Sequence, residues 1–314
     1  MERISTSSAY NGVLNNLMAA ETQQTNISDQ ISSEQVATDL QGYGGSAATL
    51  TAMQSVQAQV TGYLSNSQTT AAELSTQDTA LTQITSAATG ASQAITTALA
   101  TGSGDTLMQS LQAEFQNAVQ GLNTTFNGNY VFAGGNSSTA PVNVTSLTAL
   151  GAAPTVAGVF TNGQYVANTQ ITSSTSVQTG QLASTLGTPL FTALQAIAAY
   201  DAGPNGPLSG TLTTAQQTFL QGQITALNTA GTGLTTATAQ NGEAQAQVTS
   251  AQTALTNQQT SLSGLIGNIT NVNLAQASSQ LAQAQLAVQA SSRVFEALQS
   301  SSLLAVLQAT GSAG

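Results

Sequence analysis

The chain lacks lysine, histidine, cysteine and tryptophan, and its only cationic residues are Arg3 and Arg293. Without a thiol, an imidazole or an amine, it has few of the groups that act as nucleophiles or general bases. Zinc sites almost always use cysteine or histidine. The carboxylates are scattered singly, and the nearest approach to a cluster, Glu34 and Asp39, fits a solvated helix face. We therefore expect no enzyme, no cofactor and no metal site.

Charge is equally scarce, at 4% of residues, and the net charge is −10. Two arginines cannot neutralise a phosphate backbone, which excludes a nucleic-acid partner and argues against an anionic membrane surface. No apolar run approaches the ~20 residues that span a bilayer. The first twelve residues lack the basic cluster and apolar core of a cleaved signal peptide. The absence of cysteine excludes a disulfide-stapled fold and suits a protein that is exported unfolded.

What the chain does contain is helical periodicity at both ends, in residues 1–40 and 244–310, which are rich in Gln, Ala, Ser, Thr and Leu. In the first segment, Leu14, Leu17, Ile27 and Ile31 form one thin apolar stripe, which predicts a helix over residues 5–40. Glycines at 42, 44 and 45 are expected to end or bend this helix.

A second, longer pattern runs from Leu50 to Leu99. Fifteen positions step alternately by three and four residues, and ten of them are apolar. This spacing predicts a coiled-coil-like rod helix. Thr101–Gly104 should interrupt it, and Asp105 should cap the next helix, which reaches Leu122.

The pattern changes after residue 127. Asn127-Gly128 is a turn signal, and the Gly- and Thr-rich segment 136–185 contains short β-like runs at 156–160, 165–166 and 171–177. We expect a small folded β-rich insert, with a partly flexible loop as the alternative.

Helical spacing then returns from about Leu190, stops at 201–207, and resumes over about 213–265 and 274–307. The helices should pair first with last and second with second-last. The predicted fold is mainly α: a long antiparallel coiled-coil rod formed by the N- and C-terminal halves, with the insert in the middle. The predicted domains are 1–45 with 266–314 (terminal, inner), 46–135 with 186–265 (rod), and 136–185 (outer insert).

Three stretches resemble the family of bacterial flagellins and flagellar hook–filament junction proteins (hook-associated protein three). They are Arg3-Ile-Ser-Thr6, Asn127-Gly-Asn-Tyr-Val-Phe-Ala-Gly134 and Asn271-Val-Asn-Leu-Ala-Gln-Ala277. The second is similar to the family's NGxYxFAG motif through Asn127, Gly128, Tyr130, Phe132, Ala133 and Gly134. The third departs from the family's acidic pattern, because Asn271, Asn273 and Gln276 stand at the usual acidic positions.

The resemblance implies a structural component of the flagellum, outside the cell, whose terminal helices form an inner coiled-coil layer while the insert faces outward. It also implies flagellar type III export without a cleaved signal peptide. The implied partners are copies of the chain, other hook-associated proteins and flagellin, with an export chaperone possible. Two alternatives stay open: a flagellin filament subunit, and an extracellular glycan- or surface-binding module carried by the insert.

The thin terminal stripes suggest where assembly occurs. Because isolated helices are marginal in water, we expect the terminal helices, 1–40 and 266–310, to be poorly ordered in the monomer and to fold against neighbouring subunits. Burying each large apolar side chain there would contribute about 1.5–3 kcal/mol. The predicted assembly residues are Ile4, Leu14, Leu17, Ile27, Ile31, Leu274, Leu281, Leu286, Val294, Phe295, Leu298, Leu303, Leu304 and Leu307.

Overall fold

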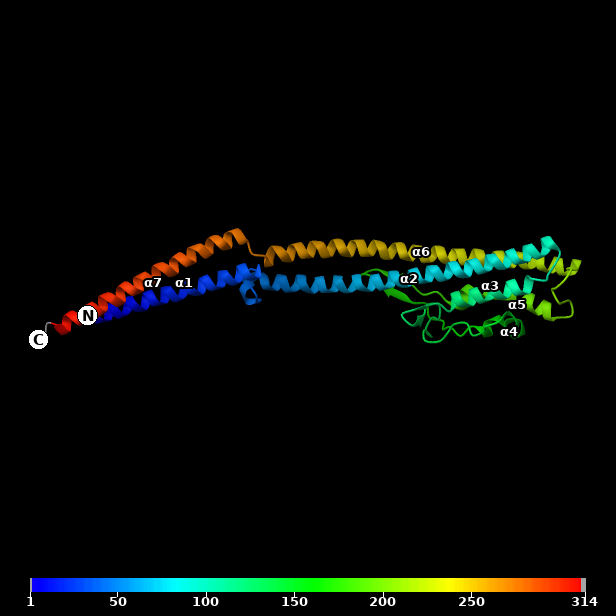
Figure 1. The fold of residues 1–314 in the computed structure, drawn as a ribbon, viewed down its shortest axis with the longest axis horizontal. Helices are drawn as coiled ribbons and strands as arrows, with labels where there is room; N and C mark the ends of the chain where they lie inside the picture. Colours follow the sequence, from blue (N-terminus) through cyan, green and yellow to red (C-terminus); the bar gives the residue numbers. More distant parts are fainter. Residues whose placement is uncertain (1, 312–314) are drawn as a thin grey trace. The chain divides into compact units, whose positions relative to one another are not determined.

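The computed structural model describes residues 2–311, and it describes the side chains of residue 8 and residues 10–300 (Figure 1). The chain divides into two compact units. We call residues 1–58 and 260–314 the terminal unit and residues 59–259 the central unit. The mainly α fold predicted from the periodicity is confirmed, since helices dominate and the strands are few and short. The predicted three-part domain division stays a prediction.

In the terminal unit, helix α1 (Glu2–Ser33) pairs with helix α7 (Leu274–Gly311), and the two ribbons run side by side in Figure 1. Ile27 is buried against Ala277 and Ala284, with Ile31, Val272 and Leu281 packed around them. The rings of Tyr10 and Phe295 lie 4.9 Å apart. Low residue numbers in α1 therefore meet high numbers in α7, so the pair is antiparallel. The expected pairing of first with last helix is confirmed.

Helix α1 ends earlier than its glycines indicated. It stops at Ser33 because Glu34 takes a positive φ of 58°, which no right-handed helix accommodates. The chain there bonds to the connection before α7: Val36 N donates to Thr270 O at 2.7 Å, and Val272 N donates to Glu34 O at 3.0 Å. The glycines instead shape the 3₁₀ helix η1 (Gln41–Ser46), where a Cβ on Gly42 would collide with Ala37.

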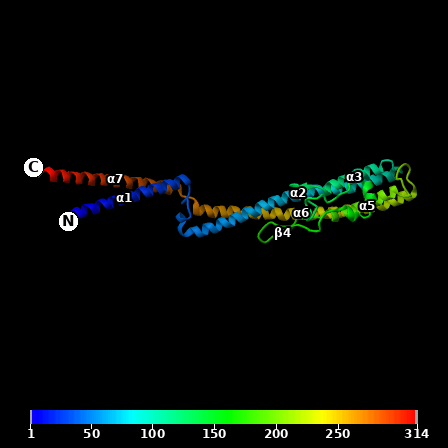
Figure 2. The ribbon, with the colours of Figure 1, turned by 90° about the horizontal axis from the view of Figure 1, so that it is seen from below.

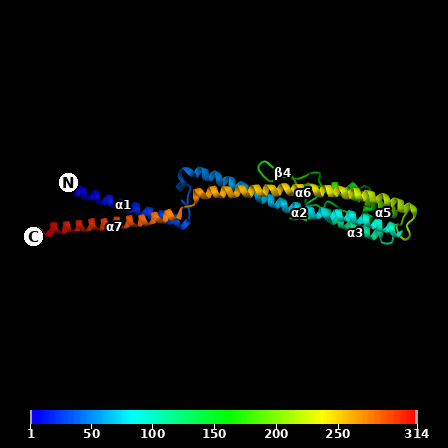
Figure 3. The same ribbon diagram turned by 90° about the horizontal axis from the view of Figure 1, so that it is seen from above.

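Helices α2 (Ala47–Thr101) and α6 (Thr214–Thr270) lie side by side along the central unit, as Figures 2 and 3 show from opposite sides. Hydrogen bonds join residue 61 to 259, residue 74 to 241 and residue 92 to 228. Numbers that rise in α2 fall in α6, so this pair is also antiparallel. All fifteen predicted stripe positions of α2 are buried or half-buried, which confirms the coiled-coil-like spacing.

The main core lies where helices α3 (Leu107–Leu122) and α5 (Ala183–Ala202) pack beside α2 and α6. Phe191 lies 5.2 Å from Phe115 and 5.4 Å from Phe160, measured between ring centroids. The predicted cap at Asp105 is wrong. Thr106 occupies the N-cap position, and Asp105 instead accepts a 2.7 Å hydrogen bond from Gly210 N, which ties this turn to the loop before α6.

The hairpin after α3 follows the turn signal in the sequence. Strands β1 (Thr125–Phe126) and β2 (Asn129–Tyr130) are antiparallel, with Phe126 opposite Asn129. The two turn residues, Asn127 and Gly128, have φ values of 49° and 81°. Positive φ at both central positions defines a type I′ turn, which Asn-Gly favours.

The insert contains less strand than predicted. Of the three expected β runs, only 171–177 overlaps a strand, because its last two residues begin β4 (Ser176–Gln178). Strand β4 pairs with β3 (Asn168–Gln170) in an antiparallel hairpin. Residues 156–160 were predicted as strand, but Val156–Val159 is the 3₁₀ helix η2, because the Thr155 side chain caps Gly158 N and a three-residue spacing buries both valines. Ser146 likewise caps the short helix α4 (Leu147–Ala152) by accepting from Ala149 N. This helix buries Leu147 and Leu150.

Candidate assembly interface

Exposed apolar side chains gather on the terminal unit. Among the described side chains, every exposed large hydrophobic residue except Tyr165 belongs to it. We call this set the terminal apolar surface. Its members are Tyr10, Met18, Val36, Leu40, Val56, Leu265, Leu274, Leu286 and Val294. Leu286 is 65% exposed and Met18 is 58% exposed, so these side chains are largely in water.

The terminal unit has little with which to cover them. Its buried hydrophobic residues, among the side chains described, are Ala20, Ile27, Leu50, Ala277 and Ala284. Three of the five are alanines, which add little apolar area. A core of this size offsets little of the conformational entropy lost when long helices are fixed in place. The α1–α7 pair therefore buries too little apolar surface to be firmly ordered by itself.

The predicted assembly residues fall into four groups. Leu274, Leu286 and Val294 are exposed and belong to the terminal apolar surface. Ile27 is buried, and Ile31 and Leu281 are half-buried with it, so these three hold α1 to α7. Leu14, Leu17, Phe295 and Leu298 are half-buried. The side chains of Ile4, Leu303, Leu304 and Leu307 lie outside the described residues.

Sequence reasoning missed six members of the surface: Tyr10, Met18, Val36, Leu40, Val56 and Leu265. Val36 and Leu40 lie in the connection between α1 and η1, where no helical period applies. Val56 and Leu265 lie on α2 and α6 but off the stripes that face their partner helices. For Val56 and Leu265, the sequence did offer a signal of an exposed contact site: each is a large apolar residue outside the predicted apolar stripe of its helix.

The residues of the predicted family motif are structural: they pack and hydrogen-bond inside the central unit. Phe132 and Ala133 are fully buried. Phe132 O accepts from Ala183 N at 2.9 Å, and Ala133 O accepts from Gly163 N at 2.8 Å. Gly134 has a φ of 59°, and a Cβ there would approach Gly163 O to 2.8 Å. This stretch therefore fastens the insert to the start of α5.

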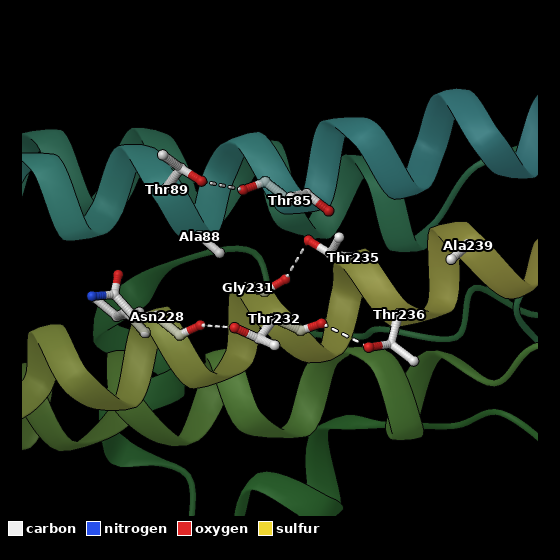
Figure 4. A pocket seen from close by; sticks show the side chains of 10 residues that line it. Thr85, Ala88, Thr89, Asn228, Gly231, Thr232, Thr235, Thr236 and Ala239 are labelled. Carbon is white, nitrogen blue, oxygen red and sulfur yellow. Dashed lines mark hydrogen bonds between the residues drawn. The ribbon is translucent and has the colours of Figure 1, made fainter.

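A separate groove of about 510 Å³ lies between α2 and α6 in the central unit (Figure 4). Its threonines bond to their own helices: Thr89 to Thr85 O, Thr232 to Asn228 O and Thr236 to Thr232 O, at 3.0–3.1 Å. Because these hydroxyls already donate within the helix, the groove presents mainly methyl groups and small side chains.

Two further properties concern chemistry. Within the described residues, no three acidic, histidine or cysteine side chains come together in a way that could hold a metal ion. The same part of the chain has no helix with both the length and the hydropathy needed to cross a bilayer.

Each of the two units is thus built around an antiparallel pair of long helices, one from each half of the chain, which defines a protein of paired long helices. The family model of the bacterial flagellin N-terminal helical region matches residues 4–137. The family model of the bacterial flagellin C-terminal helical region matches residues 224–307. Together they cover more than half of the chain, and the protein belongs to the bacterial flagellin family. It is a structural component of the bacterial flagellum.

Solved structures agree on the fold. A flagellar hook-associated protein from Vibrio parahaemolyticus superimposes with a TM-score of 0.59 at 13% identity, over 74% of this chain and 99% of that one. FlgL from Bacillus cereus gives a TM-score of 0.52 at 16% identity, over 69% and 99% respectively. A search of curated proteins gave no match.

Proposed function

We propose that this protein is the hook–filament junction subunit and that it assembles through the terminal apolar surface. The observation that carries the proposal is the separation of exposed from buried apolar side chains. The terminal unit exposes Leu286, Val294 and Met18, whereas the large apolar side chains described in the central unit are buried or half-buried, apart from Tyr165. Contiguous exposed apolar patches mark protein–protein interfaces, and we propose that these side chains form such a patch.

Assembly then follows from burial. Each exposed leucine or valine that a neighbouring subunit covers contributes about 1.5–3 kcal/mol, and several per interface offset the cost of ordering α1 and α7. Contacts between different faces of identical subunits build open helical tubes. Electrostatic repulsion between subunits should oppose these contacts only weakly, because the terminal helices carry few charges. Within α7 the charged residues are Arg293 and Glu296.

Two observations favour the junction over the filament. The stretch from Asn127 to Gly134 resembles the NGxYxFAG motif of junction proteins, and it forms the tight turn and anchored segment that such a motif would need. The fold is also similar to two solved proteins named as a hook-associated protein and FlgL. The proposed partners are the chain itself, other hook-associated proteins and flagellin, with export through the type III channel and an optional chaperone. We infer no catalytic role.

Assembly of the purified chain tests this function. We expect it to bind to the tips of isolated hooks and to support flagellin growth from them, without forming long filaments alone. Electron microscopy of hooks with and without the protein provides the measurement. Long filaments grown from the chain alone would instead identify a filament subunit. Failure to bind hooks, with no polymerisation, would refute both assignments.

A further inference from the structure

Glu73 on α2 carries a half-buried carboxylate. No hydrogen bond or ion pair joins it to another described residue, yet neither of its two oxygens is fully buried. Burial raises the pKa of Glu73 above its ordinary value of 4.5, because desolvation penalises the charged form. Residues 59–259, which form the central unit, contain no lysine or arginine. The central unit therefore holds a partly desolvated carboxylate for which it supplies no cation.

Glu73 lines a hollow of about 330 Å³ in the central unit. Three segments build this hollow: α2, the β1–β2 hairpin with the stretch that follows it, and residues 165–181. Its aromatic members are Phe126, Tyr130 and Tyr165, and we call it the tyrosine hollow. Phe126 and Tyr130 are half-buried, whereas Tyr165 is 64% exposed. A carboxylate and three aromatic side chains therefore line one cavity.

Close backbone contacts hold the segments around the tyrosine hollow. Gly134 and Gly180 both line it. A Cβ on Gly134 would approach Gly163 O to 2.8 Å, and a Cβ on Gly180 would collide with the backbone nitrogen of Ala167. Thr179 N and Gly180 N donate to Ala167 O at 2.9 and 3.0 Å. The hollow is therefore part of the folded framework of the central unit.

The tyrosine hollow also contains polar groups that the fold does not use. The side chains of Asn127, Asn129, Ser137 and Tyr130 line it, and none of them makes a hydrogen bond within the described part of the chain. Amide, hydroxyl and phenol oxygens all accept hydrogen bonds. The hollow therefore combines the Glu73 carboxylate with further acceptors and with aromatic rings.

We propose that the tyrosine hollow binds an alkylguanidinium group, the head group of an arginine side chain. A planar guanidinium donates two parallel hydrogen bonds to a carboxylate and stacks on aromatic faces. Its other N–H groups suit the additional acceptors. A primary ammonium has no planar face to stack, and a quaternary ammonium donates no hydrogen bond. This site lies within the central unit and does not rest on the proposed junction role.

Saturation-transfer NMR on the full chain at neutral pH tests the site with three small probes. We expect transfer to propylguanidinium. Propylurea, which is neutral and has nearly the same shape, should bind about tenfold more weakly because it lacks the charge-assisted pair with Glu73. Tetramethylammonium, which offers a charge but no hydrogen-bond donor, should also bind more weakly than propylguanidinium.

A fourth probe, N-acetylarginine methylamide, distinguishes two sources of the head group. If it binds as tightly as propylguanidinium, the hollow admits an arginine side chain of another protein. If only propylguanidinium binds, the ligand is a free small molecule.

Three variants locate the binding. Glu73→Gln keeps the size of the side chain and removes its charge, so it should weaken propylguanidinium binding about tenfold. Tyr165→Ala removes one aromatic face and should weaken binding about threefold. Glu243→Gln changes an exposed carboxylate on α6 that lies outside the tyrosine hollow. It is the matched control and should change nothing. Melting curves establish that each variant is folded.

Several outcomes would overturn the proposal. Absence of transfer to propylguanidinium would do so, as would equal affinity for propylurea or tighter binding of tetramethylammonium. A folded Glu73→Gln variant that loses no more affinity than Glu243→Gln would also refute it. Because hook binding is measured separately, failure here leaves the junction proposal standing.

Discussion

The terminal and central units are built from similar residues but differ in how completely they bury their large apolar side chains. The central unit closes a core around Phe115, Phe132 and Phe191, each 0% exposed. Among the described side chains, the terminal unit buries Ile27, Leu50 and three alanines, and it leaves large apolar side chains exposed. This difference is the basis of our proposal that the central unit is complete in the monomer, whereas the terminal unit buries its apolar side chains against other subunits.

The largest expected effect comes from placing charge on the terminal apolar surface. Leu286→Asp with Val294→Asp should abolish incorporation into flagella, because two carboxylates would have to be buried in the subunit interface. The free energy of unfolding of the monomer should change by no more than about 0.5 kcal/mol, since both sites are exposed. Motility and chemical denaturation provide the two measurements.

Gln221→Asp with Thr249→Asp adds the same charge at exposed positions of the central unit and is the control. If both double variants incorporate equally well, the distinction between the two units does not govern assembly.

Hydrogen exchange compares the units within one molecule. In the isolated chain, amides of residues 10–33 and 274–300 should exchange orders of magnitude faster than those of residues 59–101 and 107–122, because few buried contacts hold the terminal pair. Protection of the terminal helices should rise on incorporation. Uniform protection throughout the monomer would mean that α1 and α7 need no neighbour to be stable.

Truncations inside each unit compare the two cores. Phe115→Ala should cost about 3–5 kcal/mol, because the site is enclosed and leaves a cavity. Ile27→Ala should cost about 2 kcal/mol, at the low end for such changes, since the small cluster around it can collapse. Urea denaturation measures both. Equal losses would show that the α1–α7 pair is as firmly packed as the main core.

A glycine in the central unit should show an effect of opposite sign. Gly233 lies in the middle of α6, and a Cβ there meets nothing within 4 Å. Gly233→Ala should therefore stabilise the monomer by about 0.5–1 kcal/mol. If the variant folds with higher stability yet fails to incorporate, this face of α6 packs against a neighbouring subunit. The central unit would then contribute to the subunit interface as well.

The smallest effect concerns pH. Burial raises the pKa of Glu73 above its ordinary value of 4.5, so the folded state holds this proton more tightly than the unfolded chain does. The contribution of Glu73 to stability is therefore present below its unfolded pKa and is lost as the pH rises through the folded pKa. Glu73→Gln should remove this loss, which melting curves at pH 4 and pH 7 can measure. An unchanged pH dependence would contradict it.

Much of the helical framework was predictable because it depends on local periodicity. The steps of three and four from Leu50 to Leu99 indicated the buried face of α2, and the Asn127-Gly128 pair indicated a turn. Local capping misled the prediction in other places. Residues 156–160 have the composition of a strand, but Thr155 caps a 3₁₀ turn there, and such a cap competes with β pairing without changing composition.

By itself, the sequence determined which segments form the long helices, and that little acid–base, metal or redox chemistry is available. Only the tertiary structure decided that Ile27 is covered by α7 while Leu286 on α7 is left in water, and that Glu73, Tyr130 and Tyr165 line one hollow. The reason is that periodicity assigns a residue to a face of its own helix, whereas burial and pairing depend on what another segment, far away in the chain, places against that face.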